Sequence, residues 1–281
     1  MSEQNSAASA SVNRAKPYQL MLFPLNNGAT NVYYVLVLSY IATFGSKVLA
    51  LSMIFASVMV TGMRLFDAIT DPIIGALMDR TNGKFGKFRP FMVIGNLIMA
   101  VSILVLYGLT PLIPASMEWA RYVAFVALYA IWVIGYTFQT SCTRSGQTVL
   151  TNDPKQRPIF AMCDTVYNII LMNIVIPVIV TDSLVPKFTL TAENNAAEIA
   201  SLVAQNPALA GIVEKSGGSL SAFYNPGLFT TMQLMFGGLS AVFAVCAIIA
   251  LWRKDNPKYF GLGTTQKVGI KDYVDTLAHN R

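Results

Sequence analysis

Six long apolar segments dominate the sequence and constrain what it can fold into. They span residues 21–44, 47–78, 90–113, 119–142, 158–183 and 228–252. Each is long enough to cross the hydrocarbon core of a bilayer, which is roughly 30 Å thick. Because lipid offers no partners for backbone polar groups, a segment that crosses it must satisfy them internally as an α-helix. The sequence therefore predicts an all-α membrane protein with six transmembrane helices.

The composition excludes several classes of protein. Charged residues make up 12% of the chain and hydrophobic residues 54%, whereas a soluble domain carries about 25% charged residues. The three cysteines stand at spacings that match no zinc or redox motif. The single histidine, His279, leaves no basis for a histidine-dependent triad or metal centre. We therefore expect neither an enzyme nor a nucleic-acid-binding protein, and no resident cofactor.

Basic residues are concentrated on one side of the predicted membrane helices. Fifteen of the 20 Lys and Arg residues fall in the amino-terminal tail, after the second and fourth segments (Arg144 included), and after the sixth. Only four fall on the opposite side: Lys47, Arg121, Lys187 and Lys215. Since basic loops remain in the cytoplasm, we expect a multi-pass plasma (inner) membrane protein with both termini cytoplasmic. These loops account for the net charge of +6 without nucleic acid.

The remaining stretches define the expected domain organisation. Residues 1–18 are polar and are predicted to be a disordered cytoplasmic tail, followed by the transmembrane bundle over residues 19–252. Within it, residues 184–227 form an extracytoplasmic loop whose Ala, Leu and Ile spacing predicts one or two short surface helices. Residues 253–281 are a cytoplasmic middle-loop segment. Its apolar residues share one face of a predicted amphipathic helix.

Three charged residues of the second segment share one helical face. Arg64, Asp67 and Asp71 stand at positions i, i+3 and i+7. Charge within a membrane span is costly, so this face must look into the bundle or a watery cavity. Arg64 and Asp67 could form a structural ion pair, which leaves Asp71 over. Alternatively, the two carboxylates bind a hard cation such as Na⁺ or share a proton. The hydroxyls of Thr70 and Thr137 could contribute further ligands.

A charged loop follows the second segment. It contains Asp79, Arg80, Lys84, Lys87 and Arg89, with glycines that permit tight turns. One interpretation is an anchor that obeys the positive-inside rule. The other is a gate latch, in which Asp79 pairs with the basic residues across the cytoplasmic mouth in one conformational state. We expect the loop to combine the two roles.

Two motifs in this region resemble a known transporter family. Residues Arg64–Gly75 read Arg-x-x-Asp-Ala-Ile-x-Asp-Pro-Ile-x-Gly, and Gly86–Pro90 read Gly-Lys-Phe-Arg-Pro. This pattern resembles the glycoside–pentoside–hexuronide:cation symporters of the major facilitator superfamily. The resemblance implies twelve spans in two six-helix halves, with the sugar between them and a coupling cation (Na⁺, Li⁺ or H⁺) beside it. The chain would then be the amino-terminal half, with the carboxyl-terminal six-helix half missing.

The resemblance also assigns roles to individual residues. Asp67 and Asp71 match the cation-binding carboxylates of the family, and Thr137 matches a hydroxyl near them. Thr70 stands where a member of the family has Asn, which leaves Na⁺ and H⁺ open as the coupling ion. Asn31 and Thr140 stand where the same member has sugar-binding Asp residues. They offer no charged acceptor, so a galactoside specificity does not transfer.

Further polar residues are candidates for the sugar cavity. Asn27 and Asn168 offer amides that read sugar hydroxyls, and Tyr34 could stack on a sugar ring or simply pack between helices. Asp164 could bind substrate, take a proton or cap a helix end. The expected function is sugar:cation symport by alternating access in the lipid bilayer. The alternative is a truncated or split gene product that needs a separate carboxyl-terminal half.

Overall fold

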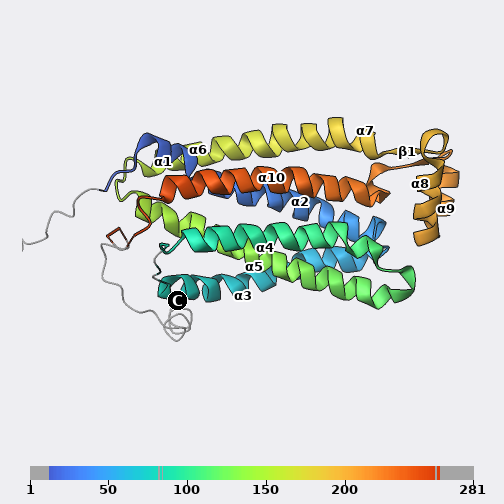
Figure 1. Cartoon of the computed structure of the whole chain (residues 1–281), viewed down its shortest axis with the longest axis horizontal. Helices are drawn as coiled ribbons and strands as arrows, with labels where there is room; N and C mark the ends of the chain where they lie inside the picture. The colour runs from blue at the N-terminus through green and yellow to red at the C-terminus, as the bar shows by residue number, and fades with distance from the viewer. Residues whose placement is uncertain (1–12, 82, 84, 257, 260–281) are drawn as a thin grey trace, which may run out of the picture.

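The helices lie side by side in one bundle (Figure 1). The computed structural model describes residues 13–81, 83, 85–256 and 258–259. Five helical stretches among them are long and apolar enough to cross a membrane: Met53–Arg80, Arg89–Leu112, Ala115–Leu150, Arg157–Phe188 and Pro226–Leu251. The prediction of an all-α membrane protein is confirmed, with five stretches rather than six meeting this criterion.

The long helices correspond in order to the six apolar segments. They are α2 (Leu25–Lys47), α3 (Met53–Arg80), α4 (Arg89–Gly108), α5 (Glu118–Leu150), α6 (Arg157–Ile170) and α10 (Pro226–Leu251). The short helix α1 (Pro17–Leu22) precedes α2. The 3₁₀ turns η1 (Thr110–Leu112) and η2 (Ala115–Met117) connect α4 to α5. Helix α2 also runs within the bundle. Its polar Asn, Tyr, Ser and Thr residues lower its mean hydropathy, so it is not among the five stretches that meet the criterion for a membrane span.

The fifth stretch is irregular. After α6 the chain continues through the π-helical turns η3 (Leu171–Val175) and η4 (Val178–Leu184) into α7 (Val185–Phe188). Pro177 lies between the two π-helical turns. Because proline lacks the backbone N–H that an α-helix needs, the local change in hydrogen bonding has a clear cause. Figure 1 shows this stretch at one edge of the bundle and α3 at the opposite edge.

Aromatic packing and close helix contacts hold the bundle together. The ring of Phe44 in α2 lies 4.7 Å from Tyr107 in α4 and 5.1 Å from Phe229 in α10, centroid to centroid. Helices α4 and α5 approach closely at Gly95 and Gly135. A Cβ atom on either would lie 2.9 Å from the carbonyl oxygen of the other. Small residues at this crossing are typical of helix pairs in membranes.

The outer face of α3 is apolar and exposed. The side chains of this stripe are Ile54, Val58, Leu65, Ile69, Ile73 and Leu77. They recur at helical spacing on the side away from the charged face. A stripe of this kind is expected to contact lipid, which leaves the charged face of α3 directed at α2 and α5.

A small helical cap covers one end of the bundle (Figure 1). It consists of α8 (Ala192–Gln205) and α9 (Leu209–Lys215), framed by the paired strands β1 (Leu190–Thr191) and β2 (Ser219–Leu220). The 3₁₀ turn η5 (Ala222–Tyr224) leads from the cap to α10. The cap has its own apolar core: Leu190, Ile199, Leu202, Leu209 and Leu220. We call this the cap end, and the end with residues 13–16, 85–88, 151–156 and 252–256 the basic end.

Several expected boundaries differ from those observed. Helix α5 continues to Leu150 rather than ending at 142, so Arg144 lies in a helix and not in the loop to which it was assigned. Lys47, expected to begin the second segment, is instead the last residue of α2. The described chain is already hydrogen-bonded at Asn13, before the expected end of the tail at residue 18. Residues 1–12 of that tail lie outside the described residues, and so do residues 260–281, which contain the amphipathic helix predicted within 253–281.

Candidate functional site

A carboxylate and two hydroxyls meet between α3 and α5. Thr137 Oγ1 donates a hydrogen bond of 2.8 Å to Asp67 Oδ1. The hydroxyls of Thr137 and Thr70 lie 3.2 Å apart, and Thr70 Oγ1 also donates to the backbone carbonyl of Asp67 at 3.0 Å. Thr70 and Thr137 are buried. Three of the residues predicted to bind a cation therefore form one cluster of oxygen atoms.

Arg64 interacts with aromatic rings rather than with Asp67. Its guanidinium lies 4.8 Å from the centroid of the Tyr34 ring. Among the ion pairs of the described residues, none joins Arg64 to Asp67. The structural ion pair considered from the sequence is therefore absent there. Arg64 and Asp67 instead line a small cavity of about 10 Å³ whose wall also includes Trp132 and Tyr136. A space of this size holds about one water-sized group.

Asp71 lies one turn further along α3 and faces a different partner. Its Oδ2 atom is 3.9 Å from a terminal guanidinium nitrogen of Arg144 in α5. The Asp71 side chain is 37% exposed and the Arg144 side chain 77% exposed. A tight charge-assisted hydrogen bond has a length of about 2.7–2.9 Å. This ion pair is therefore long and partly open.

A second polar cluster links α2 and α6. Asn27 Nδ2 donates to both carboxylate oxygens of Asp164, at 2.9 and 3.0 Å. Asn168 Nδ2 donates to Asp164 Oδ1 at 3.3 Å, and Asn31 Nδ2 donates to Asn168 Oδ1 at 2.5 Å. Four residues predicted to bind substrate are thus connected. Asp164 stands within α6 and not at its end, so the helix-cap interpretation of this residue is wrong.

A larger cavity lies beside this second cluster. Its volume is about 320 Å³, within the range of about 300–1,000 Å³ that small-molecule sites occupy. Residues of α2, α5 and α6 line it: Asn27, Tyr136, Thr140, Thr143, Arg144, Gln147, Phe160, Ala161 and Asp164. Tyr136 also borders the small cavity beside Asp67. The predicted substrate residue Tyr34 does not line this cavity. The centroid of its ring lies 6.1 Å from that of the Tyr136 ring.

At the basic end, a buried carboxylate binds the start of α4. Asp255, which follows α10, accepts hydrogen bonds from the backbone N–H groups of Lys87, Phe88 and Arg89 at 2.8–3.3 Å. The Nε atom of Arg89 also donates to it at 3.2 Å. Free N–H groups and the helix dipole make a helix N-terminus a favourable place for an anion. This arrangement, called the Asp255 clasp below, ties the loop after α3 to the end of α10.

The other predicted gating residues of this region are Asp79, Arg80, Lys84 and Lys87. Lys87 Nζ lies 2.7 Å from Asp79 Oδ1. Of the pairs expected for a gate latch, this one therefore joins Lys87 to the last turn of the adjacent helix α3. Arg80 is exposed at the end of α3. Lys84 lies outside the described residues.

The amino-terminal segment is bound to the loop after α5. Arg14 Nε lies 2.8 Å from Asp153 Oδ2, and the backbone N–H of Ala15 donates to Gln156 Oε1 at 2.8 Å. The backbone N–H of Lys155 donates to Asp153 Oδ1. That hydrogen bond, together with Arg14, holds the pKa of Asp153 below its ordinary value.

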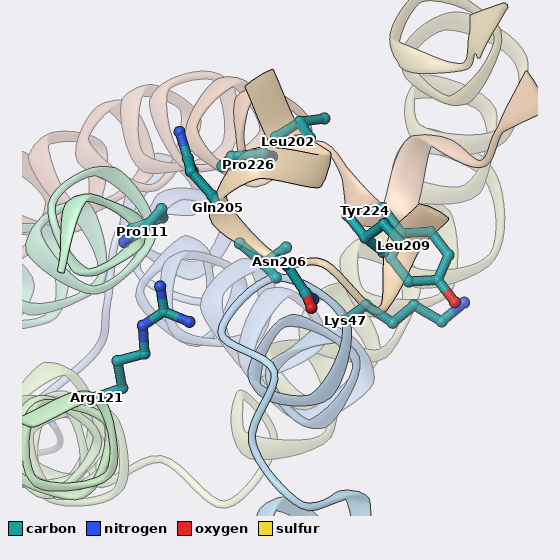
Figure 2. Close-up of a pocket in the computed structure, with 10 residues that line it drawn as sticks. Lys47, Pro111, Arg121, Leu202, Gln205, Asn206, Leu209, Tyr224 and Pro226 are labelled. Carbon is teal, nitrogen blue, oxygen red and sulfur yellow. The ribbon is translucent and has the colours of Figure 1, made fainter. Parts of the chain in front are cut away.

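The pocket under the cap is of a different kind. Figure 2 shows Arg121, Pro111 and Lys47 of the bundle facing residues of the cap. The cavity there measures only about 10 Å³. Arg121 donates to the carbonyl oxygens of Leu49 and Ile113 at 2.7–3.1 Å. These hydrogen bonds connect α5 to the chain segments after α2 and α4 at the cap end of the bundle. The cavity is too small for a sugar molecule.

Comparison with known proteins identifies the family. Residues 23–203 match the MFS/sugar transport protein family. The chain belongs to this family. Its membership confirms the resemblance seen in the two sequence motifs, and it confirms the expectation of a transporter rather than an enzyme. Together with the apolar helices, it makes the chain an integral membrane protein.

Individual relatives carry related names. The chain is 32% identical over 127 residues to the uncharacterized symporter YnaJ of Bacillus subtilis, covering 44% of this chain and 27% of that protein. It is 30% identical over 138 residues to the inner membrane symporter YicJ of Escherichia coli, covering 48% and 28%. It is 32% identical over 100 residues to a lactose permease of Leuconostoc lactis, covering 35% and 15%. The matched part of the chain thus spans less than a third of each relative.

Some residues of the site were not predicted as such. Arg144 and Gln147 were assigned to a loop because the fourth apolar segment ends before them, yet they line the cavity from α5. Asp255 was not singled out because its partners are distant in the sequence. In a membrane transporter of this family, an uninterrupted helical spacing of Thr137, Thr140, Arg144 and Gln147 could have indicated the polar face of α5.

Proposed function

We propose that this chain is the amino-terminal six-helix half of a sugar:cation symporter that works by alternating access. Helix α2 is the sixth span, and the basic end faces the cytoplasm. The family, the names of the relatives and the small share of each relative that is matched support this proposal. The basic residues at one end agree with the positive-inside rule.

One observation carries the proposal. The oxygen cluster of Asp67, Thr70 and Thr137 lies beside the cavity lined by Thr140 and Asp164, and Tyr136 borders both sites. Hard cations prefer carboxylate and hydroxyl oxygens. Amides, hydroxyls and aromatic rings suit a sugar. Adjacent sites of these two kinds are what coupled transport requires.

The coupling has a simple electrostatic basis. A bare carboxylate at membrane depth costs about 3 kcal/mol on insertion scales. A cation bound at Asp67 and Asp71, either Na⁺ or H⁺, would neutralise that charge and favour the conformation that binds sugar. Linkage makes the effect mutual, so bound sugar raises the affinity for the cation by the same factor.

The proposal is tested by uptake of a labelled methyl glycoside panel into proteoliposomes. Uptake is measured under an inward Na⁺ gradient, an inward proton gradient and no gradient. A complete carrier that contains this chain should accumulate at least one glycoside under one of the gradients only. Accumulation that is equal with and without gradients would contradict symport.

A parallel sample tests the half-carrier part of the proposal. The 281-residue chain reconstituted alone should bind glycoside without accumulating it, because one wall of the cavity belongs to the other half. Gradient-driven accumulation by the chain alone would contradict this part and leave symport intact.

A further inference from the structure

Arg144 stands between the two sites of the proposed function. It follows Thr137 by two helical turns and Thr140 by one, so all three lie on one face of α5. Its side chain lines the 320 Å³ cavity, and its guanidinium also reaches Asp71 on α3. The Arg144 side chain therefore contacts both the Asp71 carboxylate and the cavity.

The contact of Arg144 with Asp71 is weak enough to exchange. The N–O distance is 3.9 Å, with 77% of the Arg144 side chain exposed. Among the described residues, this ion pair is the polar contact of the Arg144 guanidinium, and its five N–H donors have no hydrogen-bond acceptor there. Asp71 likewise accepts no hydrogen bond from the described residues, whereas Asp67 accepts one from Thr137.

A cation bound at Asp71 would change the electrostatic attraction that holds Arg144 there. In its absence, the guanidinium is the positive charge nearest to Asp71. Once a cation neutralises the carboxylate, the Coulomb attraction for Arg144 disappears, and a bound Na⁺ would in addition repel the guanidinium. The side chain is then free to donate to ligand oxygens beside Thr140 and Gln147, with which it shares the cavity.

We propose that Arg144 couples the two sites by exchanging partners. Without a cation it occupies Asp71 and acts as an internal competitor of the coupling ion. With the cation bound it turns into the cavity and donates hydrogen bonds to the sugar. This inference rests on the proposed function and adds a positioning residue that links cation binding to sugar binding.

The test uses Arg144→Gln, which removes the charge and keeps a polar side chain. The full chain is placed in lipid nanodiscs, and cation affinity is followed by the fluorescence of Trp132, which borders the small cavity beside Asp67. Cation titrations use Na⁺ at neutral pH and protons in the absence of Na⁺. Sugar affinity is measured by calorimetry for a panel of methyl glycosides, with and without cation.

Arg144→Gln should bind the cation about 10-fold more tightly, because its competitor is gone. In the presence of cation, it should bind sugar about 10-fold more weakly. For Arg144→Gln, the ratio of the sugar affinity with cation to that without cation should fall to about 1. Arg144→Lys keeps the charge and should retain cation affinity close to that of the wild type. Lys155→Gln, a charge removal at an exposed position outside the cavity, should change nothing.

The outcomes separate this inference from the function on which it rests. If Arg144→Gln keeps the wild-type ratio of sugar affinities, the exchange is contradicted while symport stands. If both affinities fall together in Arg144→Gln and Arg144→Lys alike, Arg144 is a structural counter-ion and the exchange is again contradicted. If the wild-type chain binds no glycoside of the panel, or binds it with no cation dependence, the proposed function fails as well.

Discussion

Thr137 Oγ1 donates a hydrogen bond of 2.8 Å to Asp67 Oδ1 across the interface of α5 and α3. The bond sets the direction of the carboxylate and leaves its second oxygen free of protein donors among the described residues. It also brings the Thr70 hydroxyl within 3.2 Å of the same Thr137 oxygen. A cation that approached Asp67 would therefore meet oxygen atoms from two helices.

Thr137→Val should weaken cation binding without unfolding the protein. Valine has nearly the same shape but cannot donate to Asp67 or offer an oxygen to the ion. A hydrogen bond to a charged group is worth about 1.5–3 kcal/mol, so we expect a loss of about 10- to 100-fold in cation affinity. Trp132 fluorescence measures it. Thr148→Val, at an exposed position of the same helix, is the control and should bind as the wild type does. Equal affinities in all three proteins would contradict the assignment.

Asn168→Ala should weaken sugar binding. It removes the donor to Asp164 and the acceptor for Asn31, and so loosens the amide cluster beside the cavity. We expect sugar affinity to fall about 10-fold while cation affinity in the absence of sugar stays unchanged. The matched control is Asn173→Ala on the same stretch, where the exposed amide donates to the carbonyl of Ile169 and, within the described part of the chain, to no other residue. A similar effect of both substitutions on calorimetric sugar affinity would argue against a substrate role for the cluster.

Gly86→Ala should destabilise the Asp255 clasp. Gly86 has a φ of +91°, and a Cβ atom there would clash with the carboxylate of Asp255. Backbone strain of this kind costs about 1–3 kcal/mol, and the clash adds to it. Thermal unfolding in nanodiscs should therefore begin at a lower temperature. Gly238→Ala in α10, where a Cβ atom would meet nothing within 4 Å, should be neutral or slightly stabilising. Equal melting temperatures for the two variants would contradict the clasp.

Acid should release the amino-terminal segment from the loop after α5. The pKa of Asp153 is lowered by the backbone N–H of Lys155 and by Arg14, so folding favours its carboxylate form. The resulting stability is fully present above the ordinary Asp pKa of about 3.9 and is lost as the pH falls through the lower folded value. The difference in melting temperature between wild type and Asp153→Asn should be greatest near neutral pH. It should shrink towards zero as the pH falls below about 4. A difference that is constant over this range would show that Asp153 makes no such contribution.

The sequence predicted the helices because apolar length is a local property. Residues 21–44 and 228–252 correspond closely to α2 and α10 for this reason. The extension of α5 to Leu150 was missed because its last turns carry Thr143, Arg144 and Gln147. Those polar residues resemble a loop in the sequence, but in the fold they line a cavity.

The candidate site was only partly predictable. The one-face spacing of Asp67 and Asp71 was visible in the sequence, and so was the polarity of α2. Thr137 was named beside Asp67, and the resemblance to the symporter family supported it. Arg144 was not named as a partner of Asp71, because it lies on another helix and was assigned to a loop. The same limit hid Asp255, whose carboxylate meets backbone groups at the start of α4 that carry no sequence signal at all.

Gradient dependence of uptake in Asp67 and Asp71 variants decides whether these carboxylates couple the cation to the sugar. The complete carrier is reconstituted as wild type, Asp67→Cys and Asp71→Cys, and glycoside uptake is measured with and without the cation gradient that drives the wild type. The gradient should stimulate glycoside uptake by the wild type and by neither variant. Uptake that remained fully gradient-dependent in both variants would contradict this coupling.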